Sequence, residues 1–504
     1  MEYKFINFRN FFHFFCNKYK DKVYYLGEKQ NEVKYLELLN LIKKFNFILK
    51  KYKIKKQSKV LVILDNSKSL LVIFLSLLYH QRIFVPVNPN SGFEEIKHII
   101  KKTNPSLIIS EKIFKKKILK FKNIATLFIR HDTFFKELKN IKGIFKENLK
   151  QTKKKTIAQI LFTSGSTGNP KGVILTHKSM LSNLIDLYDA FKIKDTNPRF
   201  LSATPLYHNN GQFIPSLLPF MLGGSTLSIS PDTSLINFWP ICIRFKINYS
   251  SIMATHINYF NTLNKIKNHS IKFLFCGGAK LDISSQKIFE NKFKIKVLCN
   301  YGLTETSSIA ATEIPFQKKY LYGSVGKPLN KNKIKIVNKV NQYGEIWIKG
   351  NNVFQDYLRE KKLTRSKFKG QWFKTGDLGY INKSKFLFIK DRIDNMIIVS
   401  GENIYPSEVE NHIFKIKEIK LGVLCSVPDD ITQNKLILVY EGSKNLSISK
   451  FHKFLRNKIS RFKIPKKIIH IKDLNLDEIP KAPNKKILRK KLNLIVLKKL
   501  SKKS

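Results

Sequence analysis

Short apolar runs alternate with helix-like segments near the start of the chain, and this alternation limits the fold more than any other feature of the sequence. Three runs have the length and composition of buried strands: 60–64, 84–87 and 107–110. Three segments read as helices, one before the first run and one in each gap between runs: 34–51, 69–80 and 94–102. Strands that alternate with helices are typical of a parallel sheet covered by helices. The sequence therefore predicts an α/β fold.

The pattern changes farther along the chain. The lysine-rich stretch at 112–155 is weakly patterned, and we expect a surface excursion with short elements there. Further α/β units follow to about residue 310. Between 323 and 389 helical stretches become rare and strand-like runs favour a compact β subdomain. Mixed α and β patterns then return, so we expect an N-terminal domain at 1–390, a hinge at 391–394 and a small C-terminal domain at 395–504.

The charge of the chain is its unusual compositional property. The 504 residues include 93 Lys and Arg against 36 Asp and Glu, a formal net charge of +57. Such a charge can indicate a nucleic-acid partner or an anionic membrane surface. Lysine, however, far outnumbers arginine, the residue that binds phosphate through two hydrogen bonds, and the lysines are scattered over the whole chain. We therefore interpret the charge as a composition bias and expect no nucleic-acid partner; retention on DNA at physiological salt would contradict this.

The cysteines and the apolar runs indicate the cellular compartment of the protein and whether it spans a membrane. The five cysteines are widely spaced and form no CxxC pair, which favours a reduced, cytoplasmic setting. The longest apolar run, at 70–78, is about half of the roughly 20 residues that a membrane span needs. The phenylalanine-rich N-terminus is interrupted by charged residues and lacks a signal-peptide pattern. We expect an amphipathic first helix and no membrane span.

A segment rich in glycine and hydroxyl residues at 163–173 is the most informative motif. It reads Thr-Ser-Gly-Ser-Thr-Gly-Asn-Pro-Lys-Gly-Val. Glycines permit close approach of the backbone, successive N–H groups can form an anion-binding nest, and Lys171 adds a positive charge for a phosphate group. The spacing differs from that of the Walker phosphate loop. By composition alone, a flexible loop without a ligand is an equal alternative.

The order of these residues resembles the phosphate loop of the adenylate-forming, or AMP-binding, superfamily, which includes acyl-CoA synthetases, peptide-synthetase adenylation domains and luciferases. This resemblance covers roughly residues 34 to 492. It implies a large α/β N-terminal domain of layered sheets with a distorted β-barrel, and a small mobile α+β C-terminal domain. It also implies ATP-binding or AMP-binding roles for residues of the loop: Thr163, Ser164, Gly165, Ser166, Thr167, Gly168 and Lys171.

Two further segments resemble nucleotide-site motifs of the same family. The segment Asn-Tyr-Gly-Leu-Thr-Glu at 300–305 resembles the YGxTE motif. The resemblance implies that Tyr301 lies near adenine, that Thr304 contacts the α-phosphate and that Glu305 helps to hold Mg²⁺, an ion that prefers oxygen ligands. A small-residue segment just upstream is expected to line the adenine and acyl pockets. The implied nucleotide-binding residues of both segments are Gly277, Gly278, Ala279, Asn300, Tyr301, Gly302 and Thr304.

The ribose site and the hinge are implied by residues 372–395. Asp377 lies in a Thr-Gly-Asp motif, and its two carboxylate oxygens suit the two ribose hydroxyl groups. Arg392 takes the place of the family arginine that contacts ribose or phosphate. Asp394 falls at the residue about which the C-terminal domain of these enzymes pivots. Asp391 stands where the family usually has glycine, which puts the local turn geometry in question.

The segment Gly-Glu-Asn-Ile-Tyr-Pro-Ser-Glu-Val-Glu at 401–410 resembles a loop of acyl-CoA and aryl-CoA ligases that swings to the active site for the second step. The resemblance implies that Gly401, Glu402 and Asn403 line the tunnel for CoA. Read from the residues alone, the segment is a turn followed by a helix with Ser407 as its N-cap. Both interpretations can hold together.

A proline-rich loop near the C-terminus resembles the loop that carries the family's catalytic lysine. Alignment on residues 487–489 places this lysine at Lys486. A lysine there would stabilise the charge that builds up on the α-phosphate, and one such group can be worth about 10²–10³ in rate. Lys485 replaces the usual glycine, which would strain the loop if a positive φ is needed there. The assignment to Lys486 over Lys485 therefore stays open.

The segment Pro-Leu-Tyr-His-Asn-Asn-Gly at 205–211 resembles the PLxHxxG segment of the ligases. There the histidine lines the pocket for the carboxylate and can gate the thiol tunnel, so His208 is a candidate catalytic residue with Lys486, Thr304 and Glu305. Asn209 and Asn210 are expected to border the acyl group. A structural role for a lone histidine is the alternative.

The resemblance implies a reaction in two steps. A carboxylic acid is activated by ATP and Mg²⁺ to an acyl-adenylate with release of pyrophosphate, and the thiol of CoA then takes the acyl group with release of AMP. We therefore predict an acyl-CoA synthetase, with fatty acid metabolism as its setting. The alternatives are transfer to the phosphopantetheine of a carrier protein, a decayed relative that only binds a nucleotide, and a luciferase-like oxidation.

Overall fold

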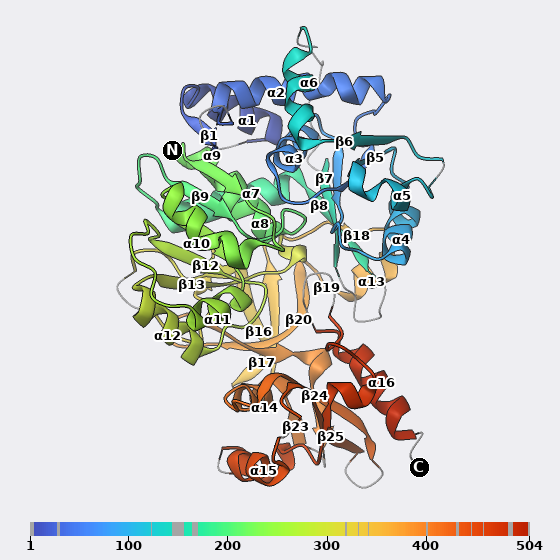
Figure 1. Cartoon of the computed structure of the whole chain (residues 1–504), viewed down its shortest axis with the longest axis vertical. Coiled ribbons are helices and arrows are strands. Elements are labelled where there is room, and N and C mark those ends of the chain that lie inside the picture. The colour runs from blue at the N-terminus through green and yellow to red at the C-terminus, as the bar shows by residue number, and fades with distance from the viewer. Residues whose placement is uncertain are drawn as a thin grey trace.

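A computed structural model gives the structure of the chain. It describes residues 5–27, 31–121, 123–143, 156–163, 170–317, 320–330, 332–340, 342–399, 402–429, 433–444, 446–456, 458–481 and 487–501. The long N-terminal part carries three sheets, and a smaller C-terminal part lies at one end of the molecule (Figure 1).

The first sheet has seven strands and confirms the α/β pattern predicted for the start of the chain. Its strand order is β18-β8-β7-β4-β3-β5-β6. The strands are β3 (Lys59–Ile63), β4 (Ile83–Pro86), β5 (Leu107–Glu111), β6 (Thr126–Ile129), β7 (Ile157–Thr163), β8 (Lys171–Thr176) and β18 (Asp356–Tyr357). Strands β3 to β7 pair in parallel, and β8 and β18 are antiparallel. The lysine-rich stretch, where we expected a surface excursion with short elements, contributes strand β6 to this sheet. Strand β6 pairs with β5 at the sheet edge.

The second sheet has nine strands in the order β15-β14-β13-β12-β11-β9-β10-β1-β2. Its strands are β1 (Val23–Tyr25), β2 (Val33–Lys34), β9 (Arg199–Ser202), β10 (Ser225–Ser228), β11 (Tyr249–Ile252), β12 (Phe273–Cys276), β13 (Lys296–Tyr301), β14 (Ala311–Thr312) and β15 (Lys327–Pro328). Strands β9, β11, β12 and β13 are parallel, so their carboxyl ends meet at one edge. In open α/β sheets ligands bind at this edge.

The region expected to form a β subdomain is a five-stranded antiparallel sheet. Its strands are β16 (Lys333–Val340), β17 (Tyr343–Lys349), β19 (Phe368–Lys369), β20 (Trp372–Ile381) and β21 (Leu387–Arg392). Within the described part of this region one short helix interrupts the strands, α13 (Lys361–Ser366).

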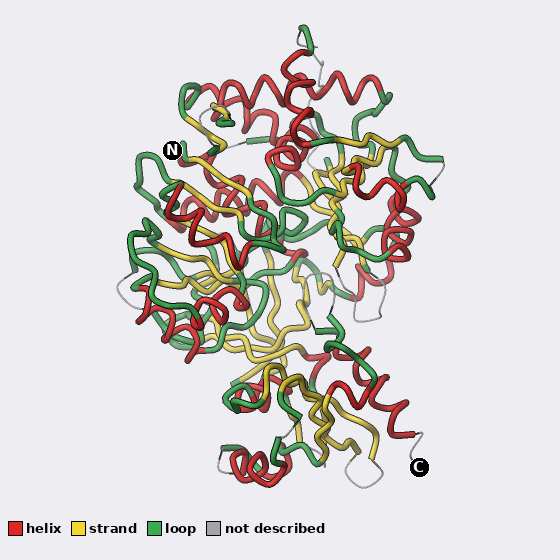
Figure 2. Tube along the Cα trace, in the orientation of Figure 1, coloured by secondary structure: helices red, strands yellow, loops and turns green. Residues whose placement is uncertain are grey.

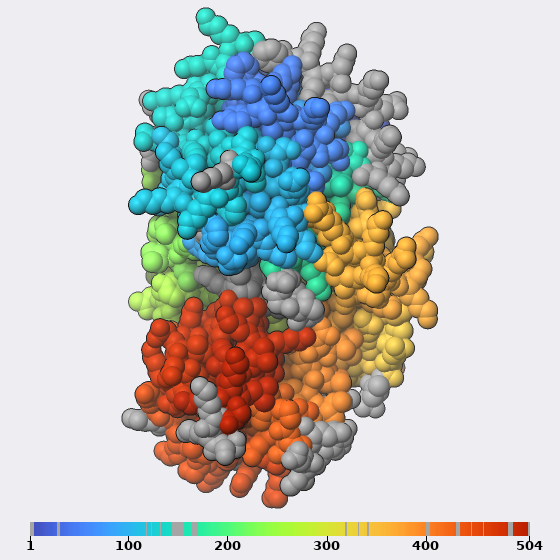
Figure 3. Space-filling view, turned by 90° about the vertical axis from the view of Figure 1, so that its right-hand side faces the viewer, coloured from blue at the N-terminus to red at the C-terminus, as the bar shows by residue number. Residues whose placement is uncertain are grey.

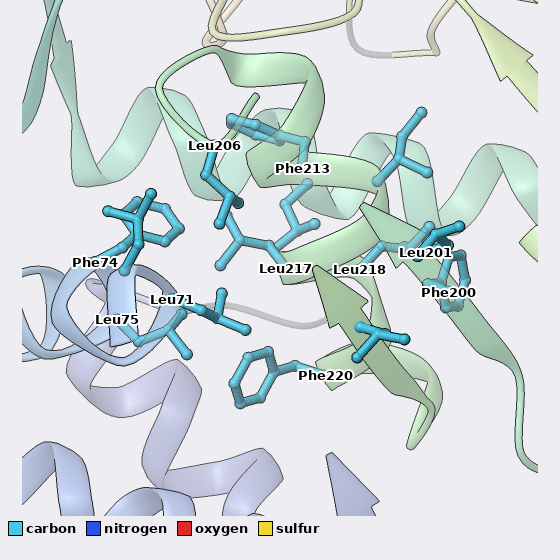
Figure 4. Packing of buried hydrophobic residues seen from close by; sticks show 14 of the residues in the cluster. Leu71, Phe74, Leu75, Phe200, Leu201, Leu206, Phe213, Leu217, Leu218 and Phe220 are labelled. Atoms are coloured by element: carbon cyan, nitrogen blue, oxygen red, sulfur yellow. The ribbon is translucent and has the colours of Figure 1, made fainter. Parts of the chain in front are cut away.

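Helices cover the first two sheets (Figure 1). They are α1 (Phe8–Lys18), α2 (Tyr35–Lys51), α3 (Lys68–Tyr79), α4 (Phe93–Thr103), α5 (Lys115–Ile118), α6 (His131–Asn140), α7 (His177–Phe191), α8 (Asn209–Gln212), α9 (Leu218–Leu222), α10 (Ser234–Arg244), α11 (Ala254–Thr262) and α12 (Ile283–Phe293). Helices α4 and α5 pack into a core of their own with the first sheet, and the large core lies under others. Helix α3 is buried on all sides, which explains its unbroken apolar run. Its Leu71, Phe74 and Leu75 face the segment that carries Leu206 and Leu217 (Figure 4). Among the described residues, no helix is both long and apolar enough to cross a bilayer.

The C-terminal part has a sheet of its own (Figure 2). The sheet contains β24 (Ile419–Asp429), β25 (Gln433–Gly442) and β26 (Lys467–His470), and a hairpin of β22 (Ile397–Val399) and β23 (Glu402–Ile404) accompanies it. Alternate side chains of β24 and β25 enter two separate cores. Helices α14 (Pro406–Ile413) and α15 (Ile448–Arg456) cover one core, and α16 (Arg489–Ser501) covers the other. The space-filling view shows this part, in red, against the larger one (Figure 3). The hinge at 391–394 stays a prediction.

Candidate functional site

The phosphate loop connects two antiparallel strands of the first sheet. Thr163 ends β7, Lys171 begins β8, and the two residues pair across the hairpin. Burial lowers the pKa of Lys171, Lys367 lowers it further, and Glu305 acts against this shift. The lysine therefore lies in the electrostatic field of the predicted metal ligand. The other predicted loop residues lie outside the described part of the chain: Ser164, Gly165, Ser166, Thr167 and Gly168.

The carboxyl ends of β12 and β13 form a cradle that only small residues permit. A Cβ atom at Gly277 would lie 2.1 Å from Oδ1 of Asn300, so the asparagine side chain occupies the space that glycine leaves. The Nδ2 group of Asn300 is buried and has no hydrogen-bond partner among the described residues. Gly278 has a φ of +82°, which favours glycine, and Gly278 and Ala279 are exposed at the rim. An unpaired buried amide suits a ligand with a hydrogen-bond acceptor.

The turn after β13 presents Glu305. At Gly302 a Cβ atom would lie 1.7 Å from the carbonyl oxygen of Ser308, so this turn requires glycine. A short 3₁₀ helix, Thr304–Thr306, follows and places Glu305 beside strand β18. The hydroxyl group of Tyr357 donates a hydrogen bond to Oε1 of Glu305 at 2.7 Å. Burial raises the pKa of Tyr357, and the carboxylate of Glu305 raises it further. Sequence reasoning missed Tyr357, because no local pattern connects it with a residue 52 positions away.

Three predicted nucleotide residues form one cluster. The Tyr301 hydroxyl donates to Oδ2 of Asp377 at 2.6 Å, and an Arg392 NH1 group donates to Oδ1 of Asp377 at 2.8 Å. Asp377 and Arg392 face each other on β20 and β21. Burial raises the pKa of Tyr301, and Asp377 raises it further. Burial alone would lower the pKa of Arg392, but Asp377 holds it above its usual value. The carboxylate is thus fixed in place, and it keeps lone pairs to accept further hydrogen bonds.

The His208 segment lies at the carboxyl ends of β9 and β11. Burial lowers the pKa of His208 to about 4, so the imidazole is neutral near pH 7. Its Nε2 atom is shielded and unpaired within the described structure. Oδ1 of Asn209 accepts from Nε2 of Gln159 at 3.1 Å, while Oδ1 of Asn210 accepts from Oγ of Ser251 at 2.7 Å. The two asparagines therefore point to different strands, and the sequence had suggested neither partner.

Of the predicted C-terminal residues, the structure describes Asp394 and the backbone of Glu402 and Asn403. Asp394 lies in a 3₁₀ helix directly after β21. The backbone of Glu402 and Asn403 belongs to β23, whose hairpin packs on β25 through a hydrogen bond from Asn434 Nδ2 to the carbonyl oxygen of Ile398, at 2.8 Å. The remaining predicted groups fall outside the description, namely Gly401, Lys485, Lys486 and the side chains of Glu402 and Asn403.

The interpretation of Ser407 as a helix cap is wrong. Helix α14 begins at Pro406, so Ser407 lies within its first turn. The capping acceptor is a carboxylate from another segment: Oδ2 of Asp391 accepts from the backbone N–H of Ser407 at 3.1 Å. The side chain of Asp391 thus performs the capping.

The donor set fits Mg²⁺ bound together with a nucleotide. In the described part of the chain no group of three or more His, Cys, Asp and Glu residues could hold a metal ion alone. Mg²⁺ usually takes one or two carboxylates plus phosphate oxygens and waters. Glu305 can supply such a carboxylate near Lys171, and the hydrogen bond from Tyr357 leaves Oε2 of Glu305 unused.

The fold and the site together define an ATP-dependent enzyme of the adenylate-forming class. The chain belongs to the AMP-binding enzyme family, which matches residues 12–358. It is 25% identical over 485 residues to peroxisomal OPC-8:0-CoA ligase 1 of Arabidopsis thaliana, which covers 91% of this chain and 87% of the relative. It is 29% identical to 2-succinylbenzoate–CoA ligase of Staphylococcus epidermidis, over 67% of this chain and 71% of that one.

Solved structures show the same fold. The o-succinylbenzoate CoA synthetase MenE of Bacillus subtilis, in complex with its acyl-adenylate intermediate, has a TM-score of 0.85 at 23% identity and covers 96% of this chain and 98% of its own. ATP-bound MatB of Rhodopseudomonas palustris has a TM-score of 0.85 at 22% identity, with 97% and 98% covered. The adenylate-forming fold is confirmed. The family and the CoA ligases among its relatives support an AMP-forming acid–CoA ligase that uses ATP, Mg²⁺ and CoA.

Proposed function

We propose that this chain joins a small carboxylic acid to CoA in two steps at one site. The carboxylate oxygen attacks the α-phosphorus atom of ATP, which forms the acyl-adenylate and releases pyrophosphate. The sulfur of CoA then attacks the acyl carbonyl carbon, which forms the thioester and releases AMP. Adenylation makes the acid reactive, because AMP is a far better leaving group than hydroxide.

The observation that carries this proposal is the cluster of Tyr301, Asp377 and Arg392 beside the Asn300 cradle. The fixed Asp377 carboxylate accepts hydrogen bonds from the ribose hydroxyl groups, and Tyr301 and Arg392 keep it oriented. The Asn300 amide, supported against Gly277, binds the edge of adenine. These groups hold the nucleotide while leaving its α-phosphate free to react.

The phosphate end is held by Lys171, Thr163, Thr304 and Glu305. Glu305 binds Mg²⁺, which neutralises phosphate charge and polarises the α-phosphate when bound. The role of Lys486 is to stabilise the charge that develops on this phosphate. Residues 401–410 resemble the mobile loop of the ligases. Rotation of the C-terminal part about Asp394 therefore brings Gly401, Glu402 and Asn403 to the site for the thiol step. Such rotation gates the two steps.

The acid is proposed only by class. His208 is neutral, so it offers the substrate an uncharged ring and not a counter-ion. Two relatives are named as CoA ligases for OPC-8:0 and for 2-succinylbenzoate, and a third is named as 4-coumarate–CoA ligase-like. We therefore include ring-bearing acids, dicarboxylic acids and fatty acids as candidates. The cytoplasmic location and a role in fatty acid metabolism remain proposals of the same kind.

Exchange of labelled pyrophosphate into ATP, measured with each acid in turn and without CoA, tests the first step. We expect one class of acid to stimulate exchange well above the background without acid, and we expect Asp377→Ala to remove that stimulation. Exchange that no acid stimulates, from a folded protein that binds ATP, would contradict the proposal. Exchange that proceeds while CoA never accepts the acyl group would indicate a carrier-protein thiol.

A further inference from the structure

A direct hydrogen bond joins Asp391, which begins the predicted hinge, to Ser407, which follows it. Helix α14 needs acceptors for the free N–H groups of its first turn, and the side chain at its N-cap, Tyr405, supplies none. Oδ2 of Asp391, from strand β21, accepts from the Ser407 N–H at 3.1 Å. Oδ1 of Asp391 accepts from the N–H of Arg392 at 2.6 Å and from Nδ2 of Asn395 at 3.0 Å, so the carboxylate is held firmly. A glycine at position 391 would offer no such acceptor.

Lys390 makes a second set of contacts across the hinge. Its carbonyl oxygen accepts from Oγ of Ser407 at 3.1 Å. Its ammonium group pairs with Oε1 of Glu408 and lies 4.1 Å from the ring centre of Tyr343 and 4.9 Å from that of Tyr405. The ion pair is partly buried, with 20% and 24% of the two side chains exposed. It is therefore less screened than a surface pair.

Each oxygen of the Glu408 carboxylate contacts a lysine, and Lys390 contacts one of them. Its other oxygen, Oε2 of Glu408, accepts from Nζ of Lys463 at 2.7 Å. Burial alone would raise the pKa of Glu408, but Lys390 and Lys463 hold it below its usual value. Lys280, in the loop after β12, also lies within the electrostatic field of Asp391 and Glu408. Charges from three separate segments thus converge on the first turn of α14.

The rest of α14 is less closely packed against the large part. A cavity of about 410 Å³ separates its end from the loop after β12, and the cavity is lined by Lys280, Asp282, Lys287, Asn411, His412 and Lys415 among others. The hydrogen bonds and the ion pair that join α14 to strand β21 are made by Ser407 and Glu408, both in its first turn. Any rotation about Asp394 has to break the bonds that Lys390 and Asp391 make to Ser407 and Glu408.

We propose that Asp391, with Lys390, is a positioning residue: its carboxylate caps α14 across the hinge and holds the C-terminal part in the orientation of the adenylation step. This inference rests on the proposed two-step function. In the described orientation the β22–β23 hairpin, which carries the backbone of Glu402 and Asn403, packs on β25. We assign this orientation to the first step because the structures that match both parts of the chain at a TM-score of 0.85, over 96% and 97% of it, hold an acyl-adenylate or ATP.

Single-turnover kinetics of Asp391→Ala separate the two steps. The first rate is adenylate formation without CoA, and the second is thioester formation when CoA is added to the enzyme–adenylate complex. Loss of a helix cap is worth about 1 kcal/mol, or about five-fold in the equilibrium between orientations. Because the ratio of the two populations changes by this factor, we expect the rate of thioester formation relative to that of adenylate formation to rise about five-fold. Asp391→Asn, which keeps one acceptor oxygen, should give a smaller change.

Asn7→Ala is the matched control, because Oδ1 of Asn7 caps α1 inside the large part at 3.0 Å. It should lower thermal stability without changing the ratio of the two rates. Equal slowing of both rates by Asp391→Ala, or an unchanged ratio, would overturn the proposal.

The contacts of Lys390 and Asp391 with Ser407 and Glu408, here called the latch, can also be tested without substrates. The quantity measured is the distance between the two parts. Dyes at Ile236→Cys on α10 and Leu494→Cys on α16, positions that are 72% and 60% exposed, report the distance between the two parts by energy transfer. Asp391→Ala should add a second population of distances that Asn7→Ala lacks. A single population in both variants would contradict the latch, whatever the fate of the proposed function.

Discussion

The hydroxyl group of Tyr357 donates a hydrogen bond to Oε1 of Glu305 at 2.7 Å. Tyr357 belongs to β18, which pairs with β8, the strand that begins at Lys171. Through this bond the carboxylate proposed to bind Mg²⁺ is anchored to the same sheet as the phosphate loop. The backbone N–H of Phe354 also donates to the carbonyl oxygen of Glu305, at 2.7 Å, so both the main chain and the side chain of Glu305 are fixed.

The first prediction concerns this bond. In Tyr357→Phe, Glu305 loses its partner at Oε1 and becomes free to rotate, so the site should bind Mg²⁺ more weakly. We expect the Mg²⁺ concentration for half-maximal adenylation to rise about three- to ten-fold, because a hydrogen bond to a charged group contributes about 1.5 kcal/mol or less in a partly exposed site. A titration of the adenylation rate with Mg²⁺ at saturating ATP measures the change.

Tyr249→Phe is the control for this titration. The Tyr249 hydroxyl also donates to a carboxylate at 2.7 Å, but its partner is Asp195, outside the proposed site. The control should leave the Mg²⁺ dependence unchanged. If both variants shift it alike, or neither does, Tyr357 does not position a metal ligand.

The second prediction tests Asp377 through the sugar. The wild-type enzyme should use ATP better than 2′-deoxy-ATP by about ten-fold in kcat/KM, since one hydrogen bond to a carboxylate is lost with the 2′-hydroxyl group. Asp377→Asn should lower kcat/KM for ATP and shrink this preference to about two-fold or less. A preference that survives in full would show that the 2′-hydroxyl group binds elsewhere.

A third prediction uses the space at Gly277. In Gly277→Ala the new Cβ atom would lie 2.1 Å from Oδ1 of Asn300, so the amide has to move. We expect KM for ATP to rise about ten-fold with little change in the melting temperature, because a side chain and not the backbone gives way. Gly92→Ala, where a Cβ atom meets nothing within 4 Å, should change neither quantity. An unchanged KM in Gly277→Ala would remove Asn300 from the nucleotide site.

The fourth prediction is a dependence of stability on pH. Burial lowers the pKa of His177, in the core beside α1, from 6.5 to about 3. The unfolded chain therefore binds a proton that the folded chain does not, and this group's contribution to stability falls as the pH drops from about 6.5 towards 3. Each pH unit in this window should lower the free energy of unfolding by about 1.4 kcal/mol from this group alone.

His177→Asn keeps an acceptor for the backbone N–H of Phe8, which lies 3.4 Å from Nδ1 of the histidine. Denaturant unfolding of this variant at several pH values should show a slope about one proton shallower than wild type between pH 6 and 4. Parallel slopes in the two proteins would mean that His177 is protonated in the folded state.

Sequence reasoning reached the α/β architecture because strand and helix patterns are local. The runs at 60–64, 84–87 and 107–110 fall on β3, β4 and β5 within one residue at most of their ends. The clustering of Tyr301 with Asp377 and Arg392 was accessible only through the family resemblance, since Tyr301 lies on a different sheet from the other two. Strand β6 was missed because its half-buried residues carry a weak pattern.

The contacts that sequence reasoning could not find are long-range pairings of ordinary residues. Nothing local distinguishes Tyr357 from the other tyrosines, and Gln159 is a lone polar residue in an apolar strand until Asn209 lies against it. Ser407 fitted the local pattern of a helix cap, yet an acceptor 16 residues earlier in the chain takes that role. Such partners depend on how strands and domains are packed, which a local pattern does not encode.

Steady-state release of pyrophosphate, measured with the acid that best supports exchange and with and without CoA, tests the central claim most directly. An AMP-forming acid–CoA ligase should release pyrophosphate continuously only when CoA is present, with AMP and an acyl-CoA thioester formed in equal amounts. Release that stops near one equivalent per enzyme with or without CoA, and no thioester by mass spectrometry, would contradict the account.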